Sequence, residues 1–171
     1  MLDAISVAWE IRSQFVRNLV DPDNGINPRL VANLTAYGAE GKPFDFSTSG
    51  CLWQANVSPV QLDQTSVASY PMIMVYTVNE QNRHDARFAT FSGDILLVVD
   101  LHLAWKKSKA QRDMESYPDA VSAALQGVLY QSDWNGINPR DLSVTTRAPV
   151  VLAATDWLQS MRVATNFEIN A

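Results

Sequence analysis

Gly93 to Trp105 reads GDILLVVDLHLAW, and from Ile95 onward every second side chain in this stretch is large and apolar. The positions between them are mixed, because Asp100 and His102 interrupt the apolar residues there. Successive side chains of a β-strand point to opposite faces of its sheet. The stretch is therefore predicted to form one long strand, with one apolar buried face and a second face turned toward water or a polar partner.

Two other stretches are predicted strands, and the first of them alternates in the same way. Residues 161–170, MRVATNFEIN, place Val163 and Phe167 on one face and Arg162 on the other. Residues 70–79, YPMIMVYTVN, form a further predicted strand that is entered through a proline, where a missing amide donor is tolerated. Because such alternation is typical of antiparallel strands with one covered face, the sequence indicates a mainly antiparallel sheet.

The amino-terminal twenty residues have the periodicity of an amphipathic helix, with an apolar stripe and charged residues mostly opposite it. The predicted stripe consists of Leu2, Ile5, Trp9, Arg12, Val16 and Leu19, widened by Ala8 and Phe15. Charged residues such as Asp3 and Glu10 interrupt the segment, unlike the apolar core of a signal peptide or a membrane span. We therefore expect a protein that is neither exported by a signal nor embedded in a membrane.

A second amphipathic helix is predicted over residues 116–130, SYPDAVSAALQGVLY. Ser116 is placed to cap its amino terminus, and Asp119 follows three residues later as the acid of a capping box. Pro118 then falls in the first turn, which tolerates proline. The buried stripe of this helix is predicted to consist of Val121, Ala124, Leu125, Val128 and Leu129.

The hexapeptide NGINPR occurs twice, at Asn24–Arg29 and at Asn135–Arg140. Both copies follow a predicted helix, but their flanking residues do not match, which argues against a duplicated domain. Because glycine, asparagine and proline are turn residues, each copy is predicted to lead from a helix into a strand. The candidate helix-exit loops are marked by Asn24, Gly25, Asn135 and Gly136. The alternative is that both loops lie on one edge and contact a partner.

Composition sets the bounds of the fold. The chain has 171 residues, of which 47% are hydrophobic and 18% charged, and this suits one domain with a sizeable core. We expect a single α+β domain over residues 1–171, with a mainly antiparallel mixed sheet flanked by two amphipathic helices and a loop-rich segment at about 38–69. The formal charge of −5 argues against a surface built wholly for nucleic acid, and the single cysteine, Cys51, excludes an intramolecular disulfide.

No residue pattern predicts an active site. The chain has two histidines, His84 and His102, and neither has the spacing of a catalytic or metal-binding motif. His102 is expected to project to the same side of its strand as Asp100, where a polar pair is favoured over a catalytic or metal role. We therefore expect no catalytic residues, no metal and no cofactor, and a protein that is not an enzyme.

Two basic clusters are candidate contacts with a lumen or a partner. Arg83, His84 and Arg87 belong to NRHDARF at a predicted hairpin tip, and Lys106, Lys107, Lys109 and Arg112 belong to WKKSKAQR after the longest strand. Each cluster alone is typical of a solvated loop. Repeated around a symmetric pore, the lysines would form a positive collar that attracts a phosphate backbone without reading its sequence. The alternative partner is an acidic surface on a neighbouring protein.

The order of these elements resembles that of the tail terminator proteins of tailed bacteriophages, also called tail completion or tail-to-head joining proteins. The resemblance is carried by the amino-terminal helix and by YPMIMVYTVNEQ, GDILLVVDLHLAW, YPDAVSAALQGVLY and SMRVATNFEIN. It extends from about Leu2 to Asn170, and residues 38–69 fit the layout least. The resemblance rests on layout and includes no catalytic signature.

The resemblance implies a hexameric ring at the end of the tail tube nearest the head. Such a ring stops polymerisation of the tube, and of the sheath in contractile tails, and presents a surface to a neck or head-completion protein. Genomic DNA passes through it without being read. The implied location is the tail and neck of the virion, with assembly in the host cytoplasm and no membrane contact. This role is binding without chemistry.

Three alternatives stay open. A different phage neck protein, such as a head-completion or connector-adaptor subunit, shares the small ring-forming layout and differs in binding portal-bearing heads rather than tail tubes. A domain that binds a small ligand would need an apolar pocket with convergent polar groups. An enzyme would be built on His102 and Asp100, and alanine at either position would then abolish its activity.

Overall fold

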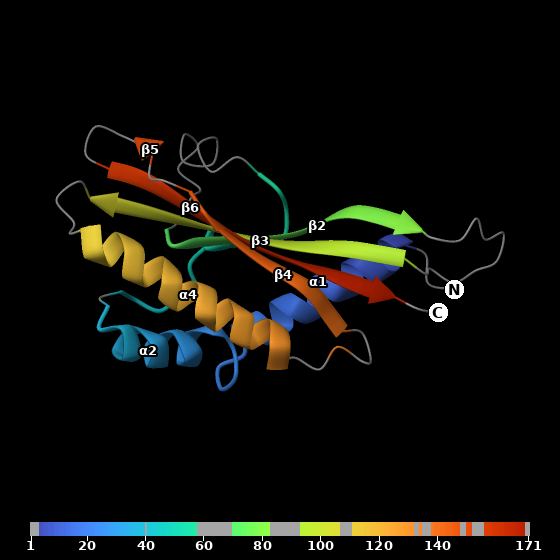
Figure 1. Ribbon diagram of the computed structural model, residues 1–171, viewed down its shortest axis with the longest axis horizontal. Helices are drawn as coiled ribbons and strands as arrows, with labels where there is room; N and C mark the ends of the chain where they lie inside the picture. The colour runs from blue at the N-terminus through green and yellow to red at the C-terminus, as the bar shows by residue number, and fades with distance from the viewer. Residues whose placement is uncertain are drawn as a thin grey trace.

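Two long antiparallel strands form the centre of the sheet. In the computed structural model, β3 (Gly93–Lys106) and β6 (Asp156–Ile169) have fourteen residues each and pair along their whole length (Figure 1). The structure describes residues 4–39, 41–57, 70–82, 93–106, 111–131, 134, 138–147, 150–151 and 156–169. The long strand predicted from the alternation at Gly93–Trp105 is confirmed.

Four further strands complete the sheet, which has the order β1-β2-β3-β6-β4, with β5 paired to β6 beside this path. They are β1 (Leu52–Trp53), β2 (Met72–Asn82), β4 (Asn138–Thr146) and β5 (Val150–Val151). Only β1 and β2 pair in parallel among these described strands. The prediction of a mixed, mainly antiparallel sheet in an α+β fold is confirmed.

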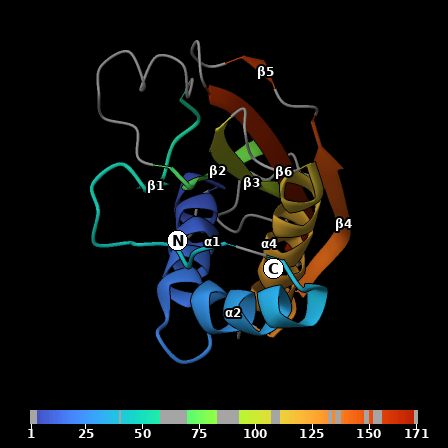
Figure 2. The same ribbon diagram turned by 90° about the vertical axis from the view of Figure 1, so that its left-hand side faces the viewer.

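The described residues form three helices, not two: α1 (Ala4–Val20), α2 (Ile26–Tyr37) and α4 (Gln111–Gln131). They gather on one side of the sheet (Figure 2). Helix α1 contacts β2 and β3, α4 contacts β4 and β6, and α2 packs mainly against α4. None of the helices in the described ranges is both long and apolar enough to cross a bilayer.

The main core lies between these helices and one face of the sheet. The odd-numbered side chains of β3 supply its centre, as the alternation predicts, and all five from Ile95 to Leu103 are buried. The predicted stripe of α4 is buried against them, since Val121, Ala124, Leu125, Val128 and Leu129 all belong to this core. Trp134 joins it and lies against Phe167 of β6, with 4.6 Å between the ring centroids.

The buried face of the first helix is rotated by part of a turn from the predicted one. The buried residues of α1 are Val7, Ala8, Ile11, Phe15 and Leu19, so the stripe repeats every four residues from Ile11. Trp9, predicted to be central in the stripe, is 55% exposed. Apolar residues cover so much of this helix's circumference that the spacing alone left its rotation open, and packing against the sheet selected it.

The predicted start of the second helix is also wrong. Helix α4 begins at Gln111, so Ser116 lies inside it and cannot cap it, and Pro118 is an interior proline. A proline within a helix removes one hydrogen bond and costs roughly 3 kcal/mol. Tyr117 and Pro118 are both buried. Packing of this part of the helix against the core therefore offsets the cost of the interior proline.

The two copies of NGINPR have different structures. After α1, the first copy does not lead into a strand: Gly25 is the N-cap of α2, and Pro28 occupies the first turn of that helix. The predicted helix-to-strand exit is therefore wrong at Asn24 and Gly25. In the second copy, Asn138 to Arg140 begin β4, as predicted, while Asn135 and Gly136 lie outside the described residues.

Candidate functional site

The sheet face opposite the helices carries a second cluster of side chains. Its apolar members are Met72, Met74, Tyr76, Val98 and Ala164, against which Trp53 and Val57 pack. The even-numbered face of β3 is thus covered in part and does not simply face water, because Asp100 and His102 are each only 7% exposed. This corrects the prediction for that face, and it places two polar groups where their hydrogen bonds matter.

Asp100, Arg162 and Tyr76 form a hydrogen-bonded network across three strands. Asp100 and Arg162 are register partners on β3 and β6. The Arg162 guanidinium donates through Nε to Asp100 Oδ1 at 2.7 Å and through Nη2 to Oδ2 at 2.8 Å. Tyr76 on β2 donates its hydroxyl to Asp100 Oδ2 at 2.8 Å and accepts from Arg162 Nη2 at 2.9 Å. Both oxygens of the Asp100 carboxylate are therefore engaged.

The network changes the protonation behaviour of its members. Hydrogen bonding to Asp100 raises the pKa of the Arg162 guanidinium, so the arginine stays charged. Burial, and then the hydrogen bond to Asp100, raise the pKa of Tyr76 to about 12, so its hydroxyl keeps its proton. At neutral pH the network therefore combines a charged guanidinium with a neutral phenol.

His102 bonds to a different partner from the one expected. Its Nδ1 lies 2.9 Å from Ser160 Oγ, its register partner on β6. His102 and Asp100 do project to the same side, as predicted, but the described hydrogen bonds of Asp100 go to Arg162 and Tyr76. Burial lowers the pKa of His102 despite the nearby Asp100, so the imidazole is neutral at neutral pH.

This arrangement differs from a serine-histidine-aspartate triad. In a triad one imidazole nitrogen faces the serine and the other faces the carboxylate that orients it. Here Ser160 occupies the Nδ1 side of His102, while the Asp100 carboxylate is saturated by Arg162 and Tyr76. Over the residues that the structure places, histidine, cysteine and acidic side chains also do not gather in groups of three that could hold a metal.

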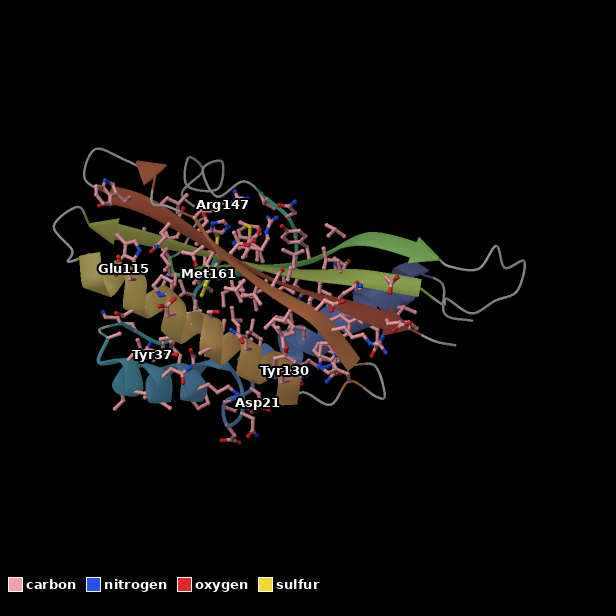
Figure 3. The ribbon with its side chains drawn as sticks, viewed as in Figure 1. Asp21, Tyr37, Glu115, Tyr130, Arg147 and Met161 are labelled. Carbon is pink, nitrogen blue, oxygen red and sulfur yellow. The ribbon has the colours of Figure 1, made fainter. Side chains whose placement is uncertain are left out.

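A cavity of about 280 Å³ opens beside this network. Its walls come from β2, β3, β6 and the segments that follow β1 and β4, and they consist of Asn56, Val57, Met74, Asp100, His102, Arg147, Ser160, Met161 and Arg162. Arg147 directly follows β4, and its backbone N–H donates to the Ser160 carbonyl at 2.8 Å. Figure 3 labels Arg147 on the side of the sheet away from α4. The cavity therefore belongs to the face opposite the helices.

A second cavity, of about 250 Å³, lies at the other side of the sheet between β3 and α4. Trp105 and Tyr117 meet there edge to face, with 5.8 Å between their ring centroids. The Tyr117 hydroxyl donates to the Lys42 carbonyl at 2.8 Å. These contacts tie the segment after α2 to the core.

The basic residues predicted as contacts are only partly placed. Lys106 ends β3, and Arg112 lies in the first turn of α4, both by their backbone. Arg83, His84, Arg87, Lys107 and Lys109 lie outside the described residues. The segment with the first three joins β2 to the start of β3, whereas Lys106 is at the other end of β3. The two clusters therefore attach to opposite ends of a strand roughly 45 Å long.

Sequence reasoning missed the residues that the structure gathers at the cavity. Arg162 was assigned to the polar face of its strand, but nothing in the sequence paired it with Asp100. Arg147, Ser160 and Asn56 carried no motif. The signal that would have found them is the register of β3 against β6, which is a property of strand pairing and not of either strand alone.

Comparison with known proteins does not assign the chain. No protein-family model matches it, and no curated protein sequence matches it significantly.

Proposed function

We propose that this protein is a structural subunit of a tailed-bacteriophage tail, which closes as a hexameric ring on the head-proximal end of the tail tube. In this role it ends polymerisation of the tube, and of the sheath where there is one, and joins the tail to a neck or head-completion protein. Genomic DNA passes through the ring. The protein acts in the virion after assembly in the host cytoplasm, and by binding rather than by chemistry.

The observation that carries the proposal is the order and pairing of the elements. An amino-terminal amphipathic helix is followed by the antiparallel pair β2 and β3, then by α4, and last by β6, which returns to pair along all of β3. This is the layout on which the resemblance to tail terminators rests. The additional helix α2 departs from the expectation, but it packs against α4 and leaves the strand order unchanged.

Exposed apolar side chains on several elements are consistent with ring formation. A ring joins two different surfaces of each subunit, which must be complementary. Trp9 on α1 and Tyr130 on α4 are 55% and 62% exposed, and Tyr37 on α2 is half exposed. Aromatic side chains are enriched at the centres of protein interfaces. Their spread over three helices provides anchors for more than one contact surface.

One edge of the sheet supplies a further contact surface. Strand β4 is the last in the strand order, and most of its described side chains are exposed, including Val144. An edge strand offers backbone N–H and C=O groups for pairing with another chain. The bulge between Arg140 and Ser143 interrupts this edge, so pairing would be confined to the residues after it.

The proposal is tested by native mass analysis of the purified chain over a wide concentration range, with and without tail tubes of the same phage. We expect a discrete hexamer, either alone or on the tube, and tubes that stop growing when the protein is added. Tubes assembled without the protein serve as the control for length.

Two results would contradict the proposal. A chain that stays monomeric in the presence of tubes and leaves their growth unchanged is not a terminator. Binding to portal-bearing heads instead of tubes would assign the protein to the neck, as a head-completion or connector-adaptor subunit.

A further inference from the structure

We propose that the cavity formed by β3, β6 and the end of β4 is a binding site for a phosphate-type oxyanion, which Arg147 attracts by charge and Ser160 and Asn56 orient by hydrogen bonds, while His102 holds the Ser160 hydroxyl in place. The site is a property of the single chain, so it does not depend on ring formation.

The charge of the cavity walls favours an anion. Arg147, Arg162 and Asp100 are the charged side chains that line it. Asp100 and Arg162 neutralise each other through two hydrogen bonds of 2.7 and 2.8 Å. Among the residues that the structure places, no salt bridge involves Arg147, whose side chain is exposed. The walls thus carry one positive charge in excess.

The arginine pair also supplies suitable donors. A guanidinium presents several N–H groups in one plane, which match two oxygens of a phosphate at once. The described hydrogen bonds of Arg162 use its Nε and Nη2, so the ion pair holds the guanidinium rigidly at the cavity wall. Arg147 brings a second guanidinium from the other side of Ser160, to whose carbonyl its own backbone is bonded at 2.8 Å.

Neutral donors converge on the same space. His102 and Ser160 face each other in the register of β3 and β6, with 2.9 Å between Nδ1 and Oγ. When the imidazole donates from Nδ1, the Ser160 hydroxyl keeps its own hydrogen for a ligand oxygen. Asn56 adds an amide from the segment after β1. His102 and Ser160 stand on two long paired strands, so their positions are fixed before a ligand arrives.

The size of the cavity limits the ligand. At about 280 Å³ it is smaller than typical sites for drug-sized molecules, which begin at roughly 300 Å³. A single phosphate group fits such a space. The two sources considered are free phosphate and one phosphate group of a nucleic acid, because both present the same chemistry to Arg147.

The experiment measures binding of inorganic phosphate to the full chain by calorimetry, at constant ionic strength maintained with chloride. We expect saturable binding of one phosphate per chain. Arg147→Ala should weaken it by at least about tenfold, the usual loss when a charge-assisted hydrogen bond is removed. The matched control is Arg140→Ala on β4, the strand that Arg147 follows, because the Arg140 side chain pairs with Glu168 away from the cavity. It should bind phosphate as the wild type does.

Competition with oligonucleotides identifies the source of the bound phosphate group. Displacement of phosphate by a 5′-phosphorylated oligonucleotide, but not by its unphosphorylated form, points to a terminal phosphate. Equal displacement by both forms points to the nucleic-acid backbone, and no displacement by either points to free phosphate.

The proposal is overturned if phosphate does not bind saturably, or if Arg140→Ala weakens binding as much as Arg147→Ala does. Should Arg147→Ala fail to fold by circular dichroism, Arg147→Lys replaces it. Lysine keeps the positive charge but lacks the planar guanidinium. Weaker phosphate binding by Arg147→Lys than by the wild type supports the site. Unchanged binding shows that Arg147 does not contact the phosphate.

Discussion

Asp100 is a charged residue buried within the sheet. Its carboxylate is buried and accepts hydrogen bonds from Arg162 and Tyr76, on the strands at either side. A buried charge is tolerated only when it is paired in this way. The pair stabilises the arrangement of β2, β3 and β6.

Asp100→Asn should therefore destabilise the protein. The amide has nearly the same shape but cannot accept hydrogen bonds at both positions, so Arg162 loses part of its pairing. We expect the free energy of unfolding in urea to fall by about 1–3 kcal/mol. The control is Asp141→Asn, at an exposed position with a positive φ of 51°, which asparagine adopts readily. Equal effects of the two substitutions would contradict a stabilising role for the network.

The lowered pKa of His102 predicts how the stability of the protein depends on pH. Burial lowers its pKa from the ordinary value of 6.5, so the unfolded chain takes up a proton before the folded one does. Stability is then fully present above pH 6.5 and is lost as the pH falls from there toward the folded pKa. The groups facing the imidazole are Asp100, which raises its pKa, and Arg162 and Arg147, which lower it.

His102→Gln removes this titration and should flatten the pH dependence. We expect the wild type to lose more stability than His102→Gln between pH 7.5 and 5.5, as measured by urea unfolding at several pH values. The other titrating groups are common to both proteins, so the difference between the two curves isolates His102. Parallel curves would show that the imidazole titrates normally.

Cys51 should be unreactive in the folded protein. The side chain is 2% exposed, and its Sγ donates to the Pro71 carbonyl at 3.2 Å. Burial, and then the charge of Asp45, raise the pKa of the thiol to about 11. The thiolate is the reactive form of cysteine. At pH 8 we therefore expect a disulfide reagent to modify Cys51 in the native protein only as fast as the fold opens transiently. In urea, where the chain is unfolded, Cys51 should react at once. Rapid modification of the native protein would contradict this burial.

Among the elements, the two copies of NGINPR are the most instructive, because one begins a helix and the other begins a strand. From Ile26 of the first copy onward, apolar residues repeat at helical spacing, and Ile26, Leu30 and Leu34 are all buried. The residues after the second, DLSVTT, include β-branched side chains and pair with β6. Six identical residues thus take the structure of the segment that follows them, since turn residues permit several conformations.

Gly25 is the point of closest approach in the first copy. A Cβ there would lie 2.3 Å from the Asp21 carbonyl oxygen and 2.6 Å from that of Leu19, so Gly25→Ala must displace the backbone between α1 and α2. We expect the free energy of unfolding to fall by about 1–3 kcal/mol, the usual cost of overpacking.

The matched control is Gly127→Ala, within α4. A Cβ at Gly127 meets the flexible Arg29 side chain, whose Nη1 lies 3.0 Å away. Alanine also favours a helix over glycine by about 1 kcal/mol. This variant should be as stable as the wild type or more so, and equal losses at the two glycines would contradict the close turn at Gly25.

For the molecule as a whole, reversing the charge of the lysines at and after the end of β3 tests the positive collar of the proposed ring. Lys106→Glu, Lys107→Glu and Lys109→Glu, combined in one variant, should impair neck assembly or DNA retention, because a positive collar attracts phosphates by its net charge. The control combines Arg17→Glu, Lys42→Glu and Arg140→Glu, which changes the net charge equally at exposed positions elsewhere in the chain. The measurements are infectious titre and DNA content of the particles. Normal particles from the collar variant would remove the collar from the proposal.

The strands, and with them the fold class, were predictable from the order of residues along the chain. Alternation at Ile95 to Trp105 has a period of two, which is imposed by the strand backbone itself, so it requires no knowledge of neighbouring elements. The same period marks β6, and the buried stripe of α4 follows the helical period, which is equally a property of the local backbone. Helix α2 was missed because its first residues are turn residues, although Ile26, Leu30 and Leu34 carried the helical spacing.

The remaining features depend on contacts between distant segments. The rotation of α1, the early start of α4 and the pairing of Asp100 with Arg162 each arise when two elements pack, and local periodicity is compatible with more than one outcome for each. The cavity belongs to this second group, since Arg147, His102 and Ser160 meet only when β4 and β3 pair with opposite edges of β6. Backbone periodicity is a local property and can be read from sequence, whereas strand register and helix rotation are selected by the packing of the whole molecule.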